Sequence, residues 1–246
     1  MSSTIDPVAV RTLGRLGADL AAGSPSQHLV ERLVDDLSRP FGLDFSIRYE
    51  LPPAAGELRL HTTIGVPAEH RTDLAVVPLG VAVCGMVADQ RRPEAHARVD
   101  VDPDERLALA RELDATAYAS WPLAAGSAVL GTLSVGSRTR PEFGAAELAV
   151  LGAAADLVTV AAARELDRAV VEAALAAQAK AQERVAHLET ALVTNRTIAT
   201  AIGVVMTRRR VTEEQAHRWL VEVSQRTNRK LRVLAEQIVH TGSLEV

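Results

Sequence analysis

The stretch LDFSIRYELPPAAGELRLHTTIG, residues 43–65, alternates apolar and polar side chains in two runs. Phe45 and Ile47 alternate with polar residues in the first run, and the second run repeats the pattern from Leu58 to Ile64. The two runs flank PPAAGE, and alternation on either side of a proline- and glycine-rich turn predicts a β-hairpin. One face of each strand is then expected to be solvated, which is typical of an antiparallel sheet.

The segments around this hairpin change between helical and extended patterns. Residues 7–39 carry leucines at three- and four-residue steps, and AGSPSQ divides them into two helices with Ser24 or Ser26 as the expected cap of the second. A short helix is expected over residues 84–90, a further helix over DPDERLALARELDA, and a second hairpin that turns at residues 125–127. This order predicts an α+β domain, with a central antiparallel sheet and helices on one side.

Two glycine-bearing phrases carry a resemblance to a known family. VPLGVAVCG and WPLAAGSAVLGTLSV, followed by RPEF and a helix, resemble a GAF domain over roughly residues 5–165. The resemblance implies a small-molecule or redox sensor module, with a ligand that stays unknown. Cys84 and Trp121 are the candidate residues of its sensor pocket. A reactive Cys84 would need a lowered thiol pKa, for which Arg91 and Arg92 lie near in sequence, and a buried structural thiol is the alternative.

A long helix is expected over residues 145–200, because no proline or glycine occurs from Ala153 to Ile202. Its later part has an apolar seam with alternating three- and four-residue spacing, as in a coiled coil. This seam consists of Val185, Leu188, Leu192, Asn195, Ala199 and Ile202. An earlier seam in a different frame consists of Leu148, Leu151, Ala155, Val158 and Ala162, and the alanine-rich stretch between them resembles a stutter. We expect a parallel homodimer through this helix; the alternative is that it folds back on its own domain.

Gly203 interrupts the polar face near the end of this helix. At about 100° per residue, one side collects Ile198, Ala201, Ile202 and Val205. The opposite side collects Arg196, Thr200, Gly203, Thr207 and Arg210. A glycine inside a helix costs about 1 kcal/mol relative to alanine, so it usually has a packing or functional reason. The notch either admits a neighbouring helix at close range or lets a phosphate or a base edge approach the backbone.

Three short helices joined by basic links are expected at the end of the chain. Thr212 and Gln215 form a capping-box pattern at the start of VTEEQAHRWL. Asn228 is the expected cap of the last helix, and the basic links TRRRV and RTNRK separate the helices. Small three-helix units often bind nucleic acid through such links.

The spaced motifs of this region resemble an ANTAR domain, from about Leu188 to Leu244 within an expected domain of residues 185–244. The motifs are Ala201-Ile202-Gly203-Val204-Val205-Met206, then Thr212, Ala216, Leu220 and Ser224 at four-residue steps, then Asn228, Leu231 and Ala235. ANTAR domains are RNA-binding antitermination modules, whose members bind a pair of RNA hairpins as a dimer and prevent formation of a transcription terminator. Many members have a polar or basic residue where this chain has Ile202, which removes one candidate RNA contact. The resemblance to GAF–ANTAR regulators spans nearly the whole chain.

Basic charge gathers in the same part of the chain. Residues 184–246 contain ten Lys and Arg and six Asp and Glu, a balance of +4 that leaves −8 for the rest. RNA hairpins are read through phosphate contacts, stacking and splayed bases. The candidate RNA-binding residues are Arg196, Thr200, Gly203, Thr207, Arg208, Arg209, Arg210, Arg229, Lys230 and Arg232. Trp219 lies on the apolar stripe of its helix and is expected in the core.

Composition and motifs disfavour several other classes of function. Cys84 is the single cysteine and the histidines show no HxxxH or HExxH spacing, so we expect no disulfide and no metal. The sequence contains no Walker loop, nucleophile elbow or kinase motif, so we expect no enzyme. No apolar run approaches the about 20 residues of a membrane span, and the N-terminus lacks the order of a secretion signal. A cytoplasmic protein is therefore expected.

Together these features predict a dimeric, signal-responsive, RNA-binding antiterminator. A DNA-binding regulator that uses the C-terminal helices as a helix-turn-helix is the first alternative. An interaction scaffold, with the coiled coil as its function, is the second.

Overall fold

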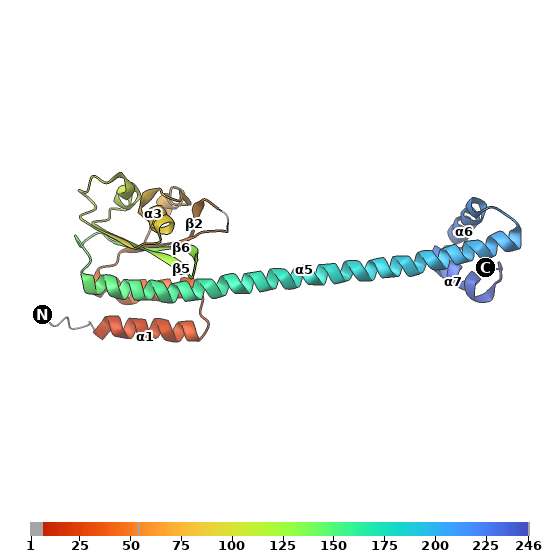
Figure 1. The fold of residues 1–246 in the computed structure, drawn as a ribbon, viewed down its shortest axis with the longest axis horizontal. Coiled ribbons are helices and arrows are strands. Elements are labelled where there is room, and N and C mark those ends of the chain that lie inside the picture. Colours follow the sequence, from red (N-terminus) through yellow and green to blue (C-terminus); the bar gives the residue numbers. More distant parts are fainter. Residues whose placement is uncertain (1–6, 54, 246) are drawn as a thin grey trace. The chain divides into compact units, whose positions relative to one another are not determined.

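The computed structural model describes residues 7–53 and 55–245 of the chain. Residues 5 and 6 of the expected GAF-like range, and Ala54 in the expected PPAAGE turn, lie outside the described residues. The chain divides into two compact units, Met1–Val170 and Val171–Val246, and helix α5 (Ala145–Arg209) belongs to both. Each unit is described by itself, with the elements labelled in Figure 1.

The first unit combines a six-stranded sheet with helices. The strands are β1 (Phe45–Glu50), β2 (Glu57–Ile64), β3 (Val76–Pro78), β4 (Glu94–Ala97), β5 (Ala117–Ala125) and β6 (Ala128–Ser137). The helices are α1 (Pro7–Ala21), α2 (Ser26–Phe41), α3 (Ala82–Gln90), α4 (Ala108–Glu112) and the start of α5, with 3₁₀ turns η1 (Ala68–Arg71) and η2 (Glu105–Leu107). The segment DPDERLALARELDA, expected as one helix, thus divides into η2 and α4.

The strands follow the order β3-β2-β1-β6-β5-β4, and each neighbouring pair is antiparallel. Both expected hairpins are confirmed: Ile47 pairs with Thr63 between β1 and β2, and Ala125 pairs with Ala128 at the turn between β5 and β6. Gly126 occupies that turn with a φ of 58°, a left-handed conformation that favours glycine.

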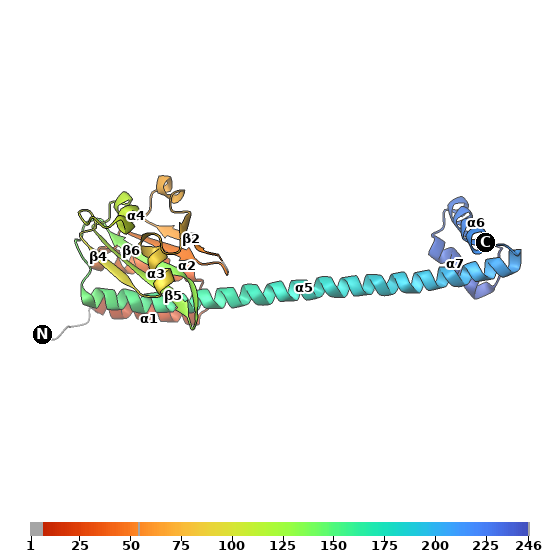
Figure 2. The same ribbon diagram turned by 45° about the horizontal axis from the view of Figure 1, so that its top comes forward.

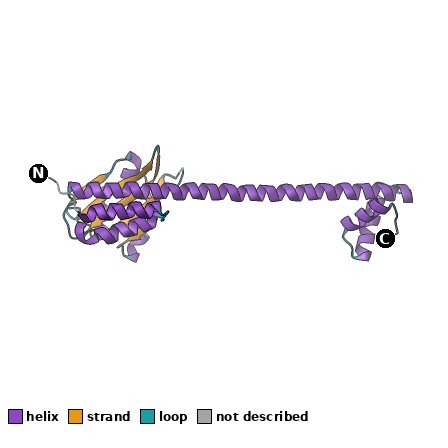
Figure 3. Ribbon diagram, turned by 90° about the horizontal axis from the view of Figure 1, so that it is seen from below, coloured by secondary structure: helices purple, strands orange, loops and turns teal. Residues whose placement is uncertain are grey.

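Helices cover both faces of the sheet, so the expectation of helices on one side only is wrong. Helices α1, α2 and the start of α5 pack with Ala119 and Leu133 on one face, whereas α3 and α4 pack with Ile47 and Tyr49 on the other. Figure 2 shows α3 and α4 beside the sheet, and Figure 3 shows three helices lying against its opposite face. The prediction of a solvated face fails for β1 because this strand is interior to the sheet and covered on both faces, although its antiparallel pairing is correct.

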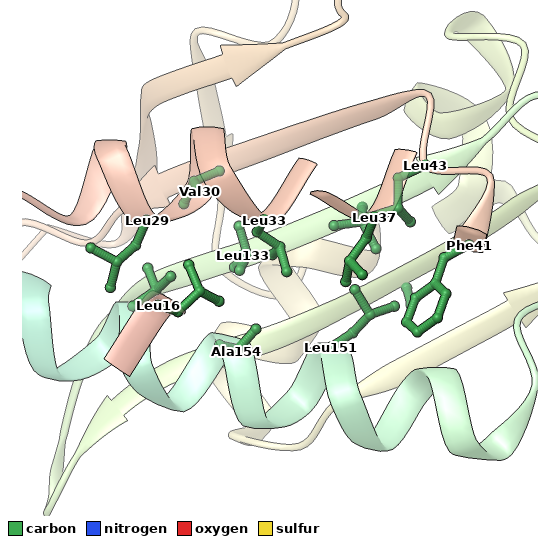
Figure 4. Packing of buried hydrophobic residues seen from close by; sticks show 14 of the residues in the cluster. Leu16, Leu29, Val30, Leu33, Leu37, Phe41, Leu43, Leu133, Leu151 and Ala154 are labelled. Carbon is green, nitrogen blue, oxygen red and sulfur yellow. The ribbon is translucent and has the colours of Figure 1, made fainter. Parts of the chain in front are cut away.

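The three-helix face contains the larger leucine cluster of this unit, which Figure 4 shows from close by. Leu33 of α2 and Leu133 of β6 are fully buried there, together with Leu151 and Ala154 of α5. Burial of one such leucine stabilises the fold by about 1.5–3 kcal/mol. The early seam of α5 therefore packs against its own domain and does not pair with a second copy. For this part of the helix the structure agrees with the alternative given above, that the helix folds back on its own domain.

The start of α2 differs from the expectation. Pro25 is the N-cap residue and makes no side-chain cap, so neither Ser24 nor Ser26 caps the helix in the expected way. Instead the backbone N–H and the hydroxyl of Ser26 donate to the two carboxylate oxygens of Glu165, at 2.7 and 2.6 Å. A carboxylate from α5 thus satisfies a backbone donor at the buried N-terminus of α2, where negative charge is favoured.

The middle of α5 is exposed throughout residues 166–193. By length and composition α5 is also the one helix of the described chain apolar enough to cross a membrane, with a mean hydropathy of 1.7 over an 18-residue window that is 39% buried. The expectation that no segment reaches the threshold for a span is therefore wrong. The start of α5 packs into the leucine cluster in the manner of a core helix.

The second unit is a small helical core formed by the last turns of α5, α6 (Glu213–Thr227) and α7 (Leu231–Thr241). Its buried residues are Ala201, Val205, Ala216, Leu220, Val223, Leu234, Ala235 and Ile238. The capping box is confirmed, because Thr212 accepts from the Gln215 N–H and Gln215 accepts from the Thr212 N–H. Asn228 ends α6 in a left-handed conformation and does not begin α7, whose N-cap is Lys230.

Candidate functional site

The polar face of α5 around Gly203 forms a shallow hollow on the second unit. The hollow is lined by Thr200, Gly203, Val204, Thr207, Arg208 and Gly242. A Cβ atom built on Gly203 meets nothing within 4 Å among the described residues. No other helix of the described chain therefore fills the notch. The explanation that Gly203 admits a neighbouring helix at close range thus finds no support within the described chain.

Two threonines border this notch, and each lies about one helical turn from Gly203. The Thr200 hydroxyl donates to the carbonyl of Arg196, and the Thr207 hydroxyl donates to the carbonyl of Gly203, each at 2.9 Å. Because each hydroxyl proton is used within the helix, the oxygen presents its lone pairs to solvent as an acceptor. The face thus offers acceptors beside cations and an open backbone.

Three consecutive arginines follow at the end of α5, and all three are exposed. The Arg209 guanidinium lies 4.9 Å from the ring centroid of Trp219, which orients it by a cation–π contact. Trp219 is half-buried against the helical core, as expected from its stripe. Arg210 follows the last residue of α5 with a φ of 54° and turns the chain towards α6.

Three of the remaining basic candidates lie at the start of α7, where Arg229 and Lys230 precede the helix and Arg232 is in its first turn. Arg229 donates to the Gln237 side chain at 2.7 Å, and Arg232 lies 3.6 Å from Glu236, whereas Lys230 is exposed. The opposite end of α7 reaches the Gly203 hollow through Gly242. Because α7 has 11 residues, the two groups of cations stand about 16 Å apart along this helix. The structure thus places Thr200, Gly203, Thr207 and Arg208 around the hollow and Arg229, Lys230 and Arg232 at the start of α7, whereas Arg196, Arg209 and Arg210 are not among the residues that line the hollow.

A separate small cavity lies between the sheet and α3 in the first unit. Tyr49, Cys84 and Tyr118 line it together with Arg106 and aliphatic side chains, and it leaves about 10 Å³ for the centre of a water molecule. That space accommodates about one water. Burial raises the pKa of both tyrosines, and the Tyr49 hydroxyl has no hydrogen-bond partner among the described residues.

Cys84 lines this cavity but is buried, with 3% of its surface exposed. Burial raises the pKa of its thiol to about 11, an effect only partly opposed by backbone hydrogen bonds. The thiol is therefore protonated near neutral pH and is a poor nucleophile. Cys84 is therefore in the environment of a buried structural thiol, which was the alternative to a reactive cysteine.

Trp121 lies on the opposite face of the sheet from this cavity. It packs against the cluster of α1, α2 and α5, where a Cβ built on Gly152 would lie 3.1 Å from the indole nitrogen. The structure therefore does not bring Trp121 and Cys84 together. Strand alternation could have identified Tyr118 in place of Trp121, since the two residues are three positions apart and face opposite sides.

A buried arginine escaped the sequence reading. Arg48 has only 2% of its side chain exposed, and its Nη2 atom lies 3.5 Å from Glu50 and 3.8 Å from Glu165. Its Nε and Nη1 atoms have no hydrogen-bond partner in the described chain, and desolvation lowers the pKa of the guanidinium. No signal in the sequence indicated its burial, because Arg48 alternates with apolar residues and was expected on the solvated face of β1.

Arg48 lies beside an irregularity in the pairing of β1 with β2. Arg48 pairs with Thr62 and Tyr49 pairs with Leu60, so His61 of β2 is the extra residue, and the neighbours Arg48 and Tyr49 face opposite sides of the sheet. Tyr49 lines the small cavity, whereas Arg48 reaches Glu165 on α5. Two adjacent residues of β1 thus contact the cavity on one face of the sheet and α5 on the other.

Comparisons with known proteins define the class. The family model of the GAF domain matches residues 24–163, and the model of the ANTAR domain matches residues 186–239. The chain therefore belongs to the GAF family and carries an ANTAR domain at its C-terminal side. A GAF domain is a sensor domain and an ANTAR domain is an RNA-binding antitermination domain, so the chain has the composition of a sensor regulator.

Solved structures show the same fold in the first unit. The GAF domain of a phosphoenolpyruvate-protein phosphotransferase from Coxiella burnetii gives a TM-score of 0.56 at 17% identity, covering 67% of this chain and 99% of that one. Its counterpart from Acinetobacter gives 0.54 at 15%, covering 67% and 98%. Free methionine-R-sulfoxide reductase from Neisseria meningitidis, solved with its substrate, gives 0.53 at 21%, covering 67% and 96%. The comparison with curated proteins gives no match.

Proposed function

We propose that this chain prevents transcription termination by binding paired RNA hairpins in nascent transcripts, under the control of a signal sensed by its GAF domain. The observation that carries the proposal is the Gly203 hollow. It combines an open helix backbone, two threonine oxygens and the exposed Arg208 on one face of the ANTAR domain. An arginine contacts phosphates in RNA, and acceptor oxygens of this kind can receive hydrogen bonds from 2′-hydroxyls.

The missing side chain at Gly203 has a direct role in this proposal. A phosphate or a base edge can approach the helix at that point without meeting a Cβ atom, while Arg208 at the rim supplies positive charge. Arg209 is held against Trp219 and presents one face of its guanidinium plane for further contacts. The basic residues at the start of α7, Arg229, Lys230 and Arg232, would contact a more distant part of the same hairpin.

Two copies of the chain are part of the proposal. One ANTAR face is small, and joining two faces raises affinity through effective concentration when two linked hairpins are present. The exposed middle of α5 is the surface available for pairing with a second copy. Action on nascent transcripts places the protein in the cytoplasm.

Control by the GAF domain requires two states of the chain with different affinity for RNA. We infer that the contact of Glu165 with Ser26 and Arg48 carries this control, because it joins α5 to β1 on the face of the sheet opposite the cavity. A ligand that moves Tyr49 would also move its chain neighbour Arg48 through the backbone of β1. The signal and any cofactor stay unidentified.

Sensing is proposed in place of catalysis. A methionine sulfoxide reductase shares the fold of the first unit at 21% identity, but thiol chemistry needs a thiolate. The raised pKa of Cys84 opposes its formation at neutral pH. Turnover of free methionine sulfoxide by the purified chain would contradict this part of the proposal.

The experiment measures binding of the full chain to a paired-hairpin transcript over a range of salt concentrations. Replacement of Arg208, Arg209 and Arg210 by alanine should lower the affinity and reduce the slope of log K against log salt by about 2, at about 0.7 per phosphate contact. The control replaces Arg11, Arg71 and Arg92, which are exposed on the GAF unit, and should bind as the wild type does.

Duplex DNA is the competitor in the same assay. The proposal expects paired hairpins to displace labelled hairpin RNA at far lower concentration than DNA of equal length. Stronger competition by duplex DNA would favour the helix-turn-helix alternative. Unchanged regulation by the triple-alanine chain would favour the scaffold alternative.

A further inference from the structure

The loop between α1 and α2 borders a small hollow whose other wall is α5, and the loop can be followed beside this helix in Figure 1. The hollow has a volume of about 130 Å³, and Ser24, Arg164, Glu165 and Arg168 form its polar lining. Pockets for drug-sized ligands measure about 300–1,000 Å³, so this hollow fits one small group. Ala161 lines it and belongs to the leucine cluster, so the hollow lies on the face of the sheet opposite the cavity of Cys84.

Two arginines of α5 give this hollow its positive charge. Arg164 and Arg168 are four positions apart, about one helical turn, and both are exposed. Arg164 donates from Nη1 to the Leu20 carbonyl in the last turn of α1 at 2.6 Å, which fixes its guanidinium beside the loop. Arg168 lies near Gly23, where its Nη2 atom would be 3.8 Å from an added Cβ. It has no hydrogen bond or ion pair within the described residues, so it is available to an anion.

The inner wall of the hollow is a carboxylate that already occupies an anion-binding arrangement. Glu165 accepts from the N–H and the hydroxyl of Ser26 and lies 3.8 Å from Nη2 of Arg48. A helix N-terminus, a hydroxyl and a guanidinium are also the donors that bind phosphate groups. Ser26 and Arg48 are buried, whereas 35% of the Glu165 side chain is exposed. An anion from solvent therefore reaches these donors by taking the place of the carboxylate.

Arg48 shows that Glu165 satisfies this arrangement incompletely. Its Nε and Nη1 atoms are buried without a hydrogen-bond partner in the described chain, and its Nη2 atom is 3.5 Å from Glu50 and 3.8 Å from Glu165. A buried charged group without hydrogen bonds is costly. A phosphate carries more negative charge and more acceptor oxygens than a carboxylate, so it would satisfy Arg48 better.

The displaced carboxylate has a second place to which it can turn. Glu165 separates the cationic hollow from a wider and more open hollow, which His28, Glu31 and His61 line on its other side. Rotation of the Glu165 side chain into this wider hollow would free Ser26 and Arg48. The backbone of α5 could stay helical during such a change.

We propose that the cationic hollow binds the phosphate group of a small molecule. Arg164 and Arg168 contact the outer side of the phosphate, and its inner side replaces Glu165 at the donors of Ser26 and Arg48. Free phosphate and a phosphate ester share this chemistry. Binding would release a side chain that joins α5 to the N-terminus of α2. The site stands on this geometry alone, whereas its control of RNA binding rests on the proposed function.

Calorimetric titration of the full chain with inorganic phosphate measures binding, at an ionic strength held constant with chloride. Arg168→Gln should weaken binding by about tenfold, because it removes a charge-assisted hydrogen bond. The fold should stay intact, since Arg168 is exposed. Arg71→Gln, at an exposed arginine elsewhere on the GAF unit, is the matched control and should bind as the wild type does. Equal binding by Arg168→Gln and the wild type would overturn the site.

Two further variants test whether phosphate replaces the carboxylate. Glu165→Gln removes the competing charge, so the affinity for phosphate should rise several-fold. Ser26→Ala removes a donor, so the affinity should fall several-fold. Circular dichroism verifies that each variant is folded. Unchanged affinity of Ser26→Ala would leave the phosphate beside the arginines of α5 only and contradict the replacement, as would weaker binding by Glu165→Gln.

The arginines of the ANTAR unit are the competing explanation for bound phosphate. The chain with Arg208, Arg209 and Arg210 replaced by alanine should bind phosphate as the wild type does, and loss of binding there would overturn the site. Glycerol phosphate in the same titration distinguishes the two sources. Tighter binding of the ester would indicate a phosphorylated metabolite, and tighter binding of inorganic phosphate would indicate the free anion. Binding of neither at millimolar concentration would overturn the proposal.

Hairpin RNA affinity with and without phosphate separates this site from the proposed function. A change in RNA affinity that Arg168→Gln abolishes is the result expected if the site controls the ANTAR unit. Phosphate binding without any effect on RNA affinity would leave the site in place and contradict its control of RNA binding. A chain that binds phosphate in the hollow but binds no hairpin contradicts the proposed function alone.

Discussion

The two parts of α5 have similar apolar periodicity but opposite surroundings. Leu151 in the first part is 1% exposed within the GAF core, whereas Leu188 in the middle part is 65% exposed. Both positions were read from the sequence as members of coiled-coil seams. The difference teaches that periodicity identifies the buried face of a helix but does not identify its partner, which for Leu151 is the same domain.

Truncation of one leucine from each part gives the largest expected contrast. Leu151→Ala removes atoms from a packed core and should lower the free energy of unfolding of the GAF unit by about 2–5 kcal/mol. Leu188→Ala should change it by less than about 0.5 kcal/mol, as exposed positions do. Chemical denaturation of the full chain at a concentration that keeps it monomeric measures both, and equal losses would break the distinction.

Glu165 marks the point where the buried part of α5 ends. Glu165→Gln keeps the size of the side chain but removes the charge that faces Arg48 and Ser26, so the unfolding free energy should fall by about 2 kcal/mol. Glu50→Gln, at the second and half-exposed partner of Arg48, should cost less than about 1 kcal/mol. If the Glu50 variant loses more stability, Glu165 is not the principal partner of Arg48.

Gly203 tests whether the exposed face of α5 serves the fold or a ligand. Gly203→Ala adds a Cβ atom into open space, so it should stabilise the ANTAR unit by about 1 kcal/mol. Thermal unfolding followed by circular dichroism measures this gain. A loss of stability would mean that the fold itself requires glycine at this position.

Cys84 tests the buried face of the GAF sheet through the pH dependence of stability. Its folded pKa is about 11, against a reference of 9.0, so the unfolded chain loses the proton first as the pH rises. The linked stability is therefore complete below about pH 9 and is lost as the pH rises towards 11. Alkylation of the native chain at pH 7.5 should be negligible and should become complete on unfolding. Rapid alkylation of the native chain would indicate an accessible thiol.

Much of the fold could be predicted because its signals are local. Alternation in residues 43–65, the Thr212 capping box and the helix of residues 145–200 are each encoded by neighbouring residues. The cover on the second sheet face could not be predicted in the same way, because α3 and α4 are too short to show a clear period. The cap of α2 also escaped prediction, because its acceptor is Glu165, 139 residues later in the chain.

The candidate site likewise has features that local sequence predicts and features that depend on packing. Helical spacing grouped Arg196, Thr200, Gly203, Thr207 and Arg210 on one face. The structure places Thr200, Gly203 and Thr207 around one hollow, which Arg208 lines and Arg196 and Arg210 do not. The distance between this hollow and Lys230 depends on how α7 packs, which the sequence does not reveal. Trp121 was grouped with Cys84 because both are distinctive residues, whereas the pleat of β5 sends Trp121 to the other face.

The most direct test of the central claim is the affinity of the full chain for a paired-hairpin RNA, compared between the wild type and Gly203→Leu. The substitution fills the hollow without a change of charge, and Thr190→Leu on an exposed turn of the same helix serves as its control. The account predicts that Gly203→Leu binds the RNA much more weakly, with its fold intact, while Thr190→Leu binds as the wild type does. Equal affinity of all three chains would contradict it.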